Sequence, residues 1–384
     1  MFKKISILGS GFGGYAMVSD LSMAGYEVNL FELPEFSKNL TPVIEKGGIE
    51  VVARTPSGQE FQLPGGGGTG FAKITGKITS NIKEAIEGVD LIMLVVPAYG
   101  RERFMREFVP YLQDGQTVVI WPGYFGAIQF AKILKDMNIK KEITICETES
   151  LIYASKRINR ELAPAFSLIT GKKEKLLLAV LPSKRTTEVL KELNKIYPQL
   201  TPAKNVLETT LTNINPPFRP LSLLLNLYRV ERKFYPYFES IGGPLCSNYD
   251  VTPGMANAME AVDRERISIG KKLGLEIKSL KDTLQTFYGG KEKNLYETIL
   301  NVYAYRTNDG PTTLNHQYIT EDVPFGLVPN ALLGDQIKVT TPTTRAMVEI
   351  GCAATGKDYW NLGLTMEKLG INNMNVKEIN NYIT

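Results

Sequence analysis

A glycine-rich turn near the start of the chain constrains its fold more than any other feature. Gly9, Gly11 and Gly14 form a G-x-G-x-x-G pattern after the apolar residues 5–8, which are typical of a short buried strand. Residues 15–24 then have the composition of a helix. In such a pattern the first glycine permits a tight turn, the second lets a pyrophosphate approach the backbone, and the third lets helix and strand pack closely. The stretch therefore predicts a dinucleotide-binding site.

The neighbouring residues refine this cofactor prediction. Phe12 and Gly13, together with Gly14, are expected to offer backbone N–H groups to the phosphates. A second strand over residues 27–31 ends at Glu32, whose carboxylate would bind the ribose hydroxyls and repel a 2′-phosphate. NAD is therefore favoured, with NADP as the alternative and FAD ranked lower because no further flavin signature is visible. The competing interpretation of Glu32 is a solvated acid at a strand end.

Residues 1–203 alternate short apolar runs with helical stretches. The apolar runs lack strict polar alternation, as expected of parallel strands covered on both faces. This pattern predicts an α/β fold with a Rossmann-type, doubly wound parallel sheet. The expected strands are residues 5–8, 28–31, 91–96, 117–120, 143–146 and 176–180.

Two regions depart from this alternation. Residues 48–80 are predicted to form short antiparallel strands around the glycine run 64–70, which is interpreted as a flexible hairpin loop rather than a phosphate cradle because no strand-to-helix transition frames it. Residues 204–384 are rich in leucine and in apolar residues at helical spacing, and predict an all-α second domain.

Composition excludes several classes of protein. The net charge is +4 with both signs interspersed, which is too mild to indicate a nucleic-acid or membrane partner. The three cysteines show neither metal-ligand spacing nor a disulfide framework, as expected in a reducing cytosol. The first residues lack the apolar core of a signal peptide, so a cytoplasmic protein without a metal site is expected.

Two further strand ends are candidates for cofactor contacts, because ligands of doubly wound sheets lie at the carboxyl ends of the strands. Pro97 follows the run 91–96, and Gly123 follows the run 117–120. Gly123 would let a backbone come close to the nicotinamide half of the cofactor. A plain turn is the competing interpretation of this glycine.

Several motifs resemble the NAD/octopine/nopaline dehydrogenases, or opine dehydrogenases, over nearly the whole chain. The resemblance implies two domains with the active site in the cleft between them, and the NAD(P)H-dependent reductive condensation of an amine, such as that of an amino acid, with a 2-oxo acid. The most specific motif is Y-I-T-E-D-V-P at 318–324. The others are the glycine turn, P-G-x-x-G at 122–126, E-T-E-S-L-I-Y at 147–153 and N-I-N-P at 213–216.

The resemblance also implies a catalytic His–Asp dyad, and here the chain departs from the family. The aspartate matches Asp322, but the expected histidine position is occupied by Arg219. The arginine expected just before the tyrosine of the last motif is Gln317. Arginine cannot act as a general acid at neutral pH, although it binds carboxylates bidentately.

Three interpretations of this departure stay open. In the first, Arg219 takes over the binding of the substrate anion from position 317. Proton transfer then moves to His316, to Tyr318 or to a water held by Asp322. In the second, the substrate has fewer carboxylates or is a preformed imine. In the third, the chain binds ligand without turnover. His316, the single histidine of the chain, could equally be a structural residue that caps its loop.

Asn215 and Tyr153 complete the candidate substrate contacts, beside Arg219 and Gln317. The competing interpretations are a turn-forming asparagine and a tyrosine buried in a structural network. The chain as a whole is predicted to be a homodimeric oxidoreductase of the opine dehydrogenase type. The alternatives are a reductase of the ketopantoate-reductase or glycerol-3-phosphate-dehydrogenase kind, for which no catalytic lysine can be placed, and a non-catalytic dinucleotide-binding protein.

Overall fold

The computed structural model describes residues 2–156, 161–231, 250–305 and 310–384. Contacts divide the chain into two compact units, of which unit 1 is Met1–Thr210 with Ile383–Thr384 and unit 2 is Leu211–Tyr382. The division falls within helix α7 (Val206–Thr212). In the described parts of the chain, no helix has the length and apolar character needed to cross a membrane.

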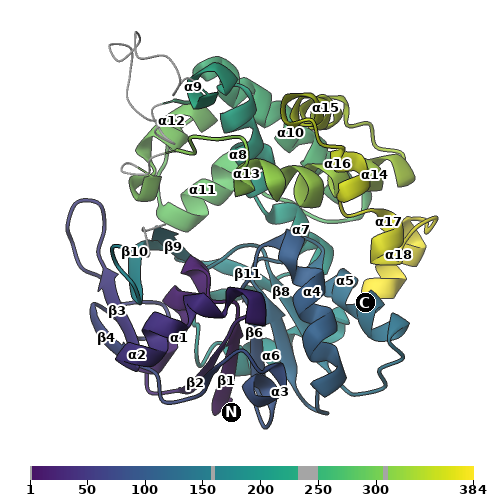
Figure 1. Ribbon diagram of the computed structural model, residues 1–384. Helices are drawn as coiled ribbons and strands as arrows, with labels where there is room; N and C mark the ends of the chain where they lie inside the picture. The colour runs from purple at the N-terminus through teal and green to yellow at the C-terminus, as the bar shows by residue number, and fades with distance from the viewer. Residues whose placement is uncertain (1, 157–160, 232–249, 306–309) are drawn as a thin grey trace. The chain divides into compact units, whose positions relative to one another are not determined.

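Within the described residues, unit 1 contains an eight-stranded sheet (Figure 1). Its strands are β1 (Lys4–Leu8), β2 (Glu27–Phe31), β5 (Ile78–Thr79), β6 (Leu91–Leu94), β7 (Thr117–Ile120), β8 (Thr144–Thr148), β11 (Leu176–Leu181) and β12 (Leu200–Pro202). They lie in the order β12-β11-β8-β7-β6-β1-β2-β5. The six neighbouring strands β5-β2-β1-β6-β7-β8 can be renumbered 1 to 6 in chain order. Their order in the sheet is then 3-2-1-4-5-6, as in a Rossmann fold and as predicted.

One strand pair contradicts the prediction of a uniformly parallel sheet. Strand β11 runs antiparallel to β8 and parallel to β12. The reason is the connection between β8 and β11, which consists of two further strands instead of a crossover helix. Parallel neighbours require a crossover, so a chain that returns without one pairs in the opposite direction.

Helices cover the sheet, and its central strands are buried on both faces. All residues of β6 and β7 are buried, which explains why these stretches lack polar alternation. Leu8 pairs with Leu94, so the carboxyl ends of β1 and β6 are adjacent where the strand order reverses. The unit 1 helices are α1 (Phe12–Met23), α2 (Thr41–Lys46), α3 (Ile82–Ile86), α4 (Ala98–Phe108), α5 (Gly126–Asp136), α6 (Thr186–Leu193) and the 3₁₀ turns η1 (Pro34–Asn39), η2 (Val109–Tyr111) and η3 (Ser183–Arg185).

A second, four-stranded sheet packs on the other side of α1 (Figure 1). Its order is β4 (Gly70–Lys73), β3 (Gly48–Ala53), β10 (Phe166–Lys172) and β9 (Tyr153–Lys156). The antiparallel pairing of β3 with β4 confirms the predicted hairpin, whereas β9 and β10 were not predicted. Helix α1 is therefore enclosed by two sheets, and this explains why Tyr15–Leu21 is buried on all sides.

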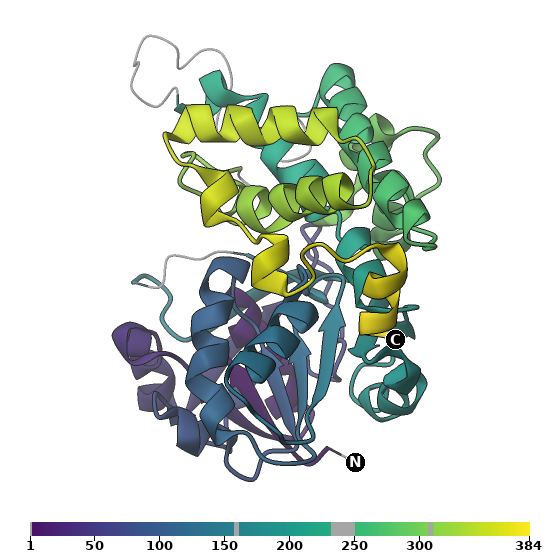
Figure 2. The same ribbon diagram turned by 90° about the vertical axis from the view of Figure 1, so that its right-hand side faces the viewer.

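Unit 2 is helical throughout its described residues, as predicted (Figures 1 and 2). Its helices are α8 (Asn215–Leu224), α9 (Leu227–Glu231), α10 (Pro253–Lys272), α11 (Leu280–Tyr288), α12 (Leu295–Asn301), α13 (Gln317–Thr320), α14 (Val328–Gln336), α15 (Pro342–Thr355), α16 (Tyr359–Leu362), α17 (Met366–Leu369) and α18 (Val376–Ile383), with the turns η6 (Tyr303–Tyr305) and η7 (Val323–Leu327). The aromatic residues 235–238, on which the dimer prediction rested, lie outside the described residues.

Helix α8 is the element that organises the functional part of unit 2. It packs against α10, α13, α15 and η7, and most of its residues are buried. Figure 2 shows α14 and α15 side by side on the side of unit 2 that faces the viewer. The motifs 213–216 and 318–324 therefore lie on elements that pack together, namely α8, α13 and η7.

Candidate active site

The glycine turn has the geometry that its three glycines predict. Gly9 has a φ of +109°, and a Cβ placed on it would lie 2.5 Å from the Val95 carbonyl oxygen. A Cβ on Gly14 would lie 1.9 Å from the Gly9 carbonyl oxygen, so helix α1 touches the turn directly. A Cβ on Gly11 would meet no described atom within 4 Å. The first and third glycines are therefore needed for packing, and the second faces open space.

Open space at Gly11 coincides with the N-terminus of helix α1. Gly11 is the N-cap residue and provides no side chain to cap the helix, and the first turn contains no acidic residue. Phe12, Gly13 and Gly14 form that first turn, where backbone N–H groups and the positive end of the helix dipole favour an anion. These residues fit the pyrophosphate of a dinucleotide, which would supply the hydride of the reaction from its nicotinamide ring.

The Glu32 carboxylate hydrogen-bonds to the glycine turn and is largely buried. Its Oε2 accepts hydrogen bonds from the backbone N–H of Ser10 at 2.9 Å and from the Ser10 hydroxyl at 2.7 Å. Its Oε1 accepts from the Leu33 N–H at 2.9 Å, and the residue is only 7% exposed. The interpretation as a solvated acid is therefore wrong. Oε1 accepts only one of these hydrogen bonds and keeps a second lone pair, so Glu32 can stabilise the turn and still accept a ribose hydroxyl.

Pro97 and Gly123 follow the carboxyl ends of β6 and β7, as the sequence predicted. Pro97 is the N-cap residue of α4. A Cβ on Gly123 would lie 2.5 Å from Cδ of Glu147. Gly123 is therefore required by a buried carboxylate, which is a packing reason that the sequence could not reveal.

That carboxylate belongs to a buried network that holds the 122–127 loop. Glu147 accepts hydrogen bonds from the Ala127 N–H at 2.9 Å and from the Thr209 and Thr210 hydroxyls at 2.7 Å each. Burial raises the pKa of Glu147, and these hydrogen bonds oppose that rise. Arg101, also buried, donates to the carbonyl oxygens of Gly123 and Tyr124 from α4. These contacts support a structural role for Glu147.

Tyr153 has a similar structural environment. Its hydroxyl donates to Oδ2 of Asp20 at 2.7 Å, and the N–H groups of Gly65 and Gly67 donate to the same carboxylate at 2.7 Å each. The glycine run 64–70 therefore cradles a carboxylate of α1. Burial raises the pKa of Asp20, and the three hydrogen bonds oppose that rise. The geometry favours the structural interpretation of Tyr153 over a substrate contact.

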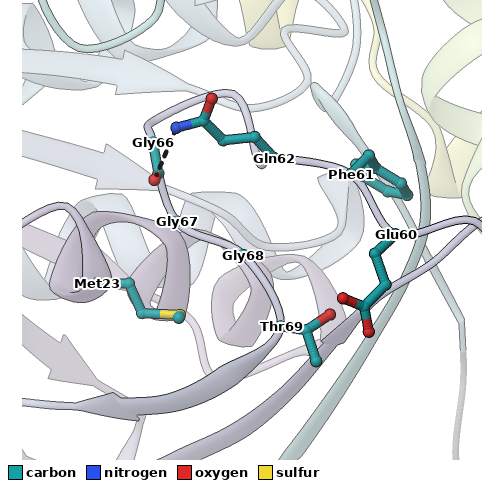
Figure 3. A pocket seen from close by; sticks show the side chains of 8 residues that line it. All are labelled: Met23, Glu60, Phe61, Gln62, Gly66, Gly67, Gly68 and Thr69. Carbon is teal, nitrogen blue, oxygen red and sulfur yellow. Dashed lines mark hydrogen bonds between the residues drawn. The ribbon is translucent and has the colours of Figure 1, made fainter.

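An open pocket beside this glycine run lies away from the predicted chemistry (Figure 3). Met23, at the C-terminal end of α1, lines it, whereas the glycine turn is at the other end of the same helix. A helix of this length separates the two ends by roughly 16 Å. The pocket is lined by Met23, Glu60, Phe61, Gln62, Gly66, Gly67, Gly68 and Thr69.

Unit 2 brings together Arg219 and Asp322, which occupy the two positions of the dyad implied by the family resemblance. Nη1 of Arg219, on α8, lies 3.7 Å from Oδ2 of Asp322, just before η7. The Asp322 side chain is completely buried, whereas the Arg219 side chain is 26% exposed. A guanidinium replaces the expected imidazole, forms an ion pair with the aspartate and keeps part of its surface available to an anion.

His316 and Tyr318 adjoin this pair. The Arg219 Cζ lies 4.9 Å from the centroid of the Tyr318 ring, which contacts the His316 ring edge-on at 4.7 Å between centroids. His316 is the N-cap residue of α13, and its Nδ1 accepts from the Tyr318 N–H at 3.3 Å. The capping role considered for His316 is thus observed, while its Nε2 is not used by this hydrogen bond.

The remaining substrate candidates lie at helix starts in the same unit. Asn215 begins α8, and its backbone N–H donates to the side chain of Asn213 at 2.9 Å. This contact is typical of a turn-forming asparagine, which was the competing interpretation to a substrate contact for Asn215. Gln317 is the first residue of α13 and is half-buried.

Aromatic residues that the sequence reasoning missed surround Arg219. The Phe218 and Tyr305 rings stack with centroids 6.0 Å apart, and the Tyr288 ring meets Tyr305 at 5.6 Å. Burial raises the pKa of Tyr305 to about 12, although the Arg219 guanidinium acts in the opposite direction. Scattered single tyrosines carry no periodic signal, so only the tertiary structure assembles this cluster.

Comparison with known proteins agrees with this architecture. The family model described as NAD/NADP octopine/nopaline dehydrogenase, alpha-helical domain, matches residues 202–355. An opine dehydrogenase of Arthrobacter sp. (strain 1C) is 31% identical over 375 residues, which covers 97% of this chain and 96% of the relative. A solved octopine dehydrogenase with NADH and agmatine has a TM-score of 0.76 at 18% identity and covers 98% and 97% of the two chains.

The fold and the glycine site define a dinucleotide-dependent dehydrogenase. The chain belongs to the opine dehydrogenase family and is an NAD(P)H-dependent oxidoreductase. A yersinopine dehydrogenase with NADP⁺ bound shares the fold with a TM-score of 0.71 at 15% identity, covering 92% and 91% of the two chains. Solved structures that share this fold therefore contain either NADH or NADP⁺.

Proposed function

We propose that this enzyme condenses a primary amine with a 2-oxo acid and reduces the resulting imine to a secondary amine. The amine nitrogen attacks the oxo carbon and water leaves, after which the imine carbon accepts a hydride from bound NADH. The observation that carries the proposal is the Arg219–Asp322 pair, which occupies the two positions of the dyad implied by the family resemblance. Related octopine dehydrogenase structures contain NADH with L-arginine or with pyruvate, which supports these substrate classes.

Arg219 is the proposed binding group for the carboxylate of the 2-oxo acid. A guanidinium matches a carboxylate bidentately, and the exposed part of Arg219 provides the surface for it. Asp322, which is completely buried, pairs with the charge of the guanidinium. Gln317 and Asn215, at the starts of α13 and α8, supply amide groups that can hydrogen-bond the polar atoms of the substrates.

Proton transfer must come from another group, because Arg219 stays charged at neutral pH. His316 is proposed for this step. The donating form is the imidazolium, which gives up the proton on Nε2. In that form Nδ1 is also protonated, so it releases the backbone hydrogen bond that it accepts in the neutral ring. A substrate with fewer carboxylates, or a preformed imine, is the second candidate function, favoured by the loss of an arginine at Gln317.

The test is an NADH oxidation assay with 2-oxo acids in the presence and absence of a panel of amines. Turnover that requires both substrates, with the secondary amine detected by mass spectrometry, is the expected result. Turnover of the oxo acid alone would instead indicate a ketone reductase. NADH binding without turnover under any combination would indicate a binding protein and contradict the proposal.

For the cofactor, we propose NAD over NADP and expect Glu32→Ala to reduce the preference for NADH by about tenfold, since a hydrogen bond to a charged group contributes about 1.5–3 kcal/mol. The measurement is the ratio of kcat/KM for NADH and NADPH. Glu27→Ala, at the exposed start of the same strand, is the control and should leave the ratio unchanged. A strong NADPH preference in the unaltered enzyme would refute the assignment of Glu32.

A further inference from the structure

The Tyr318 ring lies against the group proposed to bind the 2-oxo acid. The Arg219 Cζ is 4.9 Å from the ring centroid, which is within the range in which a guanidinium is attracted to the face of an aromatic ring. On its edge, the same ring is in contact with His316. The Tyr318 ring is therefore in contact with both Arg219 and His316.

The ion pair with Asp322 does not by itself set the orientation of the Arg219 guanidinium. Its 3.7 Å separation is longer than a hydrogen bond, so the pair holds the charge of Arg219 without setting the plane of the guanidinium. Bidentate recognition of a carboxylate depends on that plane. The flat face of the Tyr318 ring lies against the guanidinium and restrains that plane.

Both contacts with Arg219 come from one turn of the chain. Tyr318 and Asp322 are four residues apart, and the hydrogen bonds of α13 run from the N–H groups of Ile319 and Thr320 to the carbonyl oxygen of His316. Residues at this spacing lie on the same face of a helical turn. The ring and the carboxylate thus contact Arg219 from adjacent positions, which fixes its long side chain at two points.

We propose that the aromatic ring of Tyr318, and not its hydroxyl, positions Arg219 for the carboxylate of the 2-oxo acid. Tyr318 is a positioning residue in this proposal, which rests on the proposed role of Arg219. The unbranched stem of arginine has several rotatable bonds, so losing the ring would let the guanidinium leave the orientation that the substrate requires.

The test compares Tyr318→Phe, which keeps the ring, with Tyr318→Leu, which removes it. Tyr318→Phe is expected to keep the KM for the 2-oxo acid within about twofold, whereas Tyr318→Leu raises it about tenfold, with the KM for NADH unchanged in both. Thermal unfolding of each variant checks folding. Tyr318→Met replaces Tyr318→Leu if the latter does not fold, because methionine adapts to irregular space.

Trp360→Leu is the matched control. Arg345 lies over the Trp360 ring with its Cζ 5.1 Å from the centroid, so this substitution removes a comparable contact that faces no proposed substrate group. It should leave every KM unchanged. An unchanged KM in Tyr318→Leu would overturn the proposal, and so would an equal loss in Tyr318→Phe, which would assign the effect to the hydroxyl. If Arg219→Ala also leaves the KM for the oxo acid unchanged, the proposed function itself fails.

Discussion

Gly14→Ala is expected to abolish NADH binding and to destabilise unit 1. The added Cβ would lie 1.9 Å from the Gly9 carbonyl oxygen, a distance at which backbone atoms must move apart. Gly9 cannot move aside, because the Val95 carbonyl oxygen already lies next to it, 2.5 Å from where a Cβ on Gly9 would be. Overpacking of this kind costs about 1–3 kcal/mol and more where the backbone is involved. NADH fluorescence titration and thermal unfolding would measure both effects.

Gly11→Ala is the matched control for this prediction. A Cβ on Gly11 meets no described atom within 4 Å, and its φ of −68° suits any residue. The variant should therefore unfold at the temperature of the unaltered protein, yet bind NADH more weakly because the methyl group points into the space assigned to the pyrophosphate. Equal destabilisation by the two alanines would contradict this account of the turn.

Arg219→Ala is expected to raise the KM for the 2-oxo acid by about 100-fold while leaving the KM for NADH within about twofold. Loss of a bidentate, charge-assisted contact accounts for the size of this effect. Removing the guanidinium also leaves the carboxylate of Asp322 buried without its ion-pair partner, so a lower unfolding temperature is expected. Steady-state kinetics with each substrate varied in turn, together with thermal unfolding, measure the two effects.

Arg219→Lys separates charge from geometry at the same position. Lysine keeps the positive charge beside Asp322 but lacks the planar fork of a guanidinium. It should restore most of the stability and little of the affinity for the oxo acid. Full activity in Arg219→Lys would show that a point charge is sufficient, and an unchanged KM in Arg219→Ala would remove Arg219 from the substrate site.

The sequence predicted the Rossmann core well because its strands are local, apolar and bounded by glycines. The run 117–120 is observed as β7 with the same bounds. The second sheet was only half predicted, since β10 joins β3 through pairings between residues more than 100 positions apart, and β9 then pairs with β10. Propensity within a short window carries no information about such partners.

Buried polar residues were the least predictable part of the candidate site. The segment 172–175 has the composition of a solvated turn, yet Lys173 is 7% exposed and donates to the Leu151 carbonyl. Arg101 and Glu147 are likewise charged residues inside unit 1. Charged residues are buried only when specific partners compensate for the loss of water, and those partners come from distant parts of the chain.

Glycine spacing and short motifs are local properties. The sequence was therefore sufficient to predict a dinucleotide-binding chain of the opine dehydrogenase type. It also located the departure at Arg219 and Gln317. The tertiary structure was needed to identify the contacts of Arg219, which pairs with Asp322 and lies over the Tyr318 ring. Helices α8 and α13 bring residues about 100 positions apart into contact, and such contacts are set by packing, which no local pattern encodes.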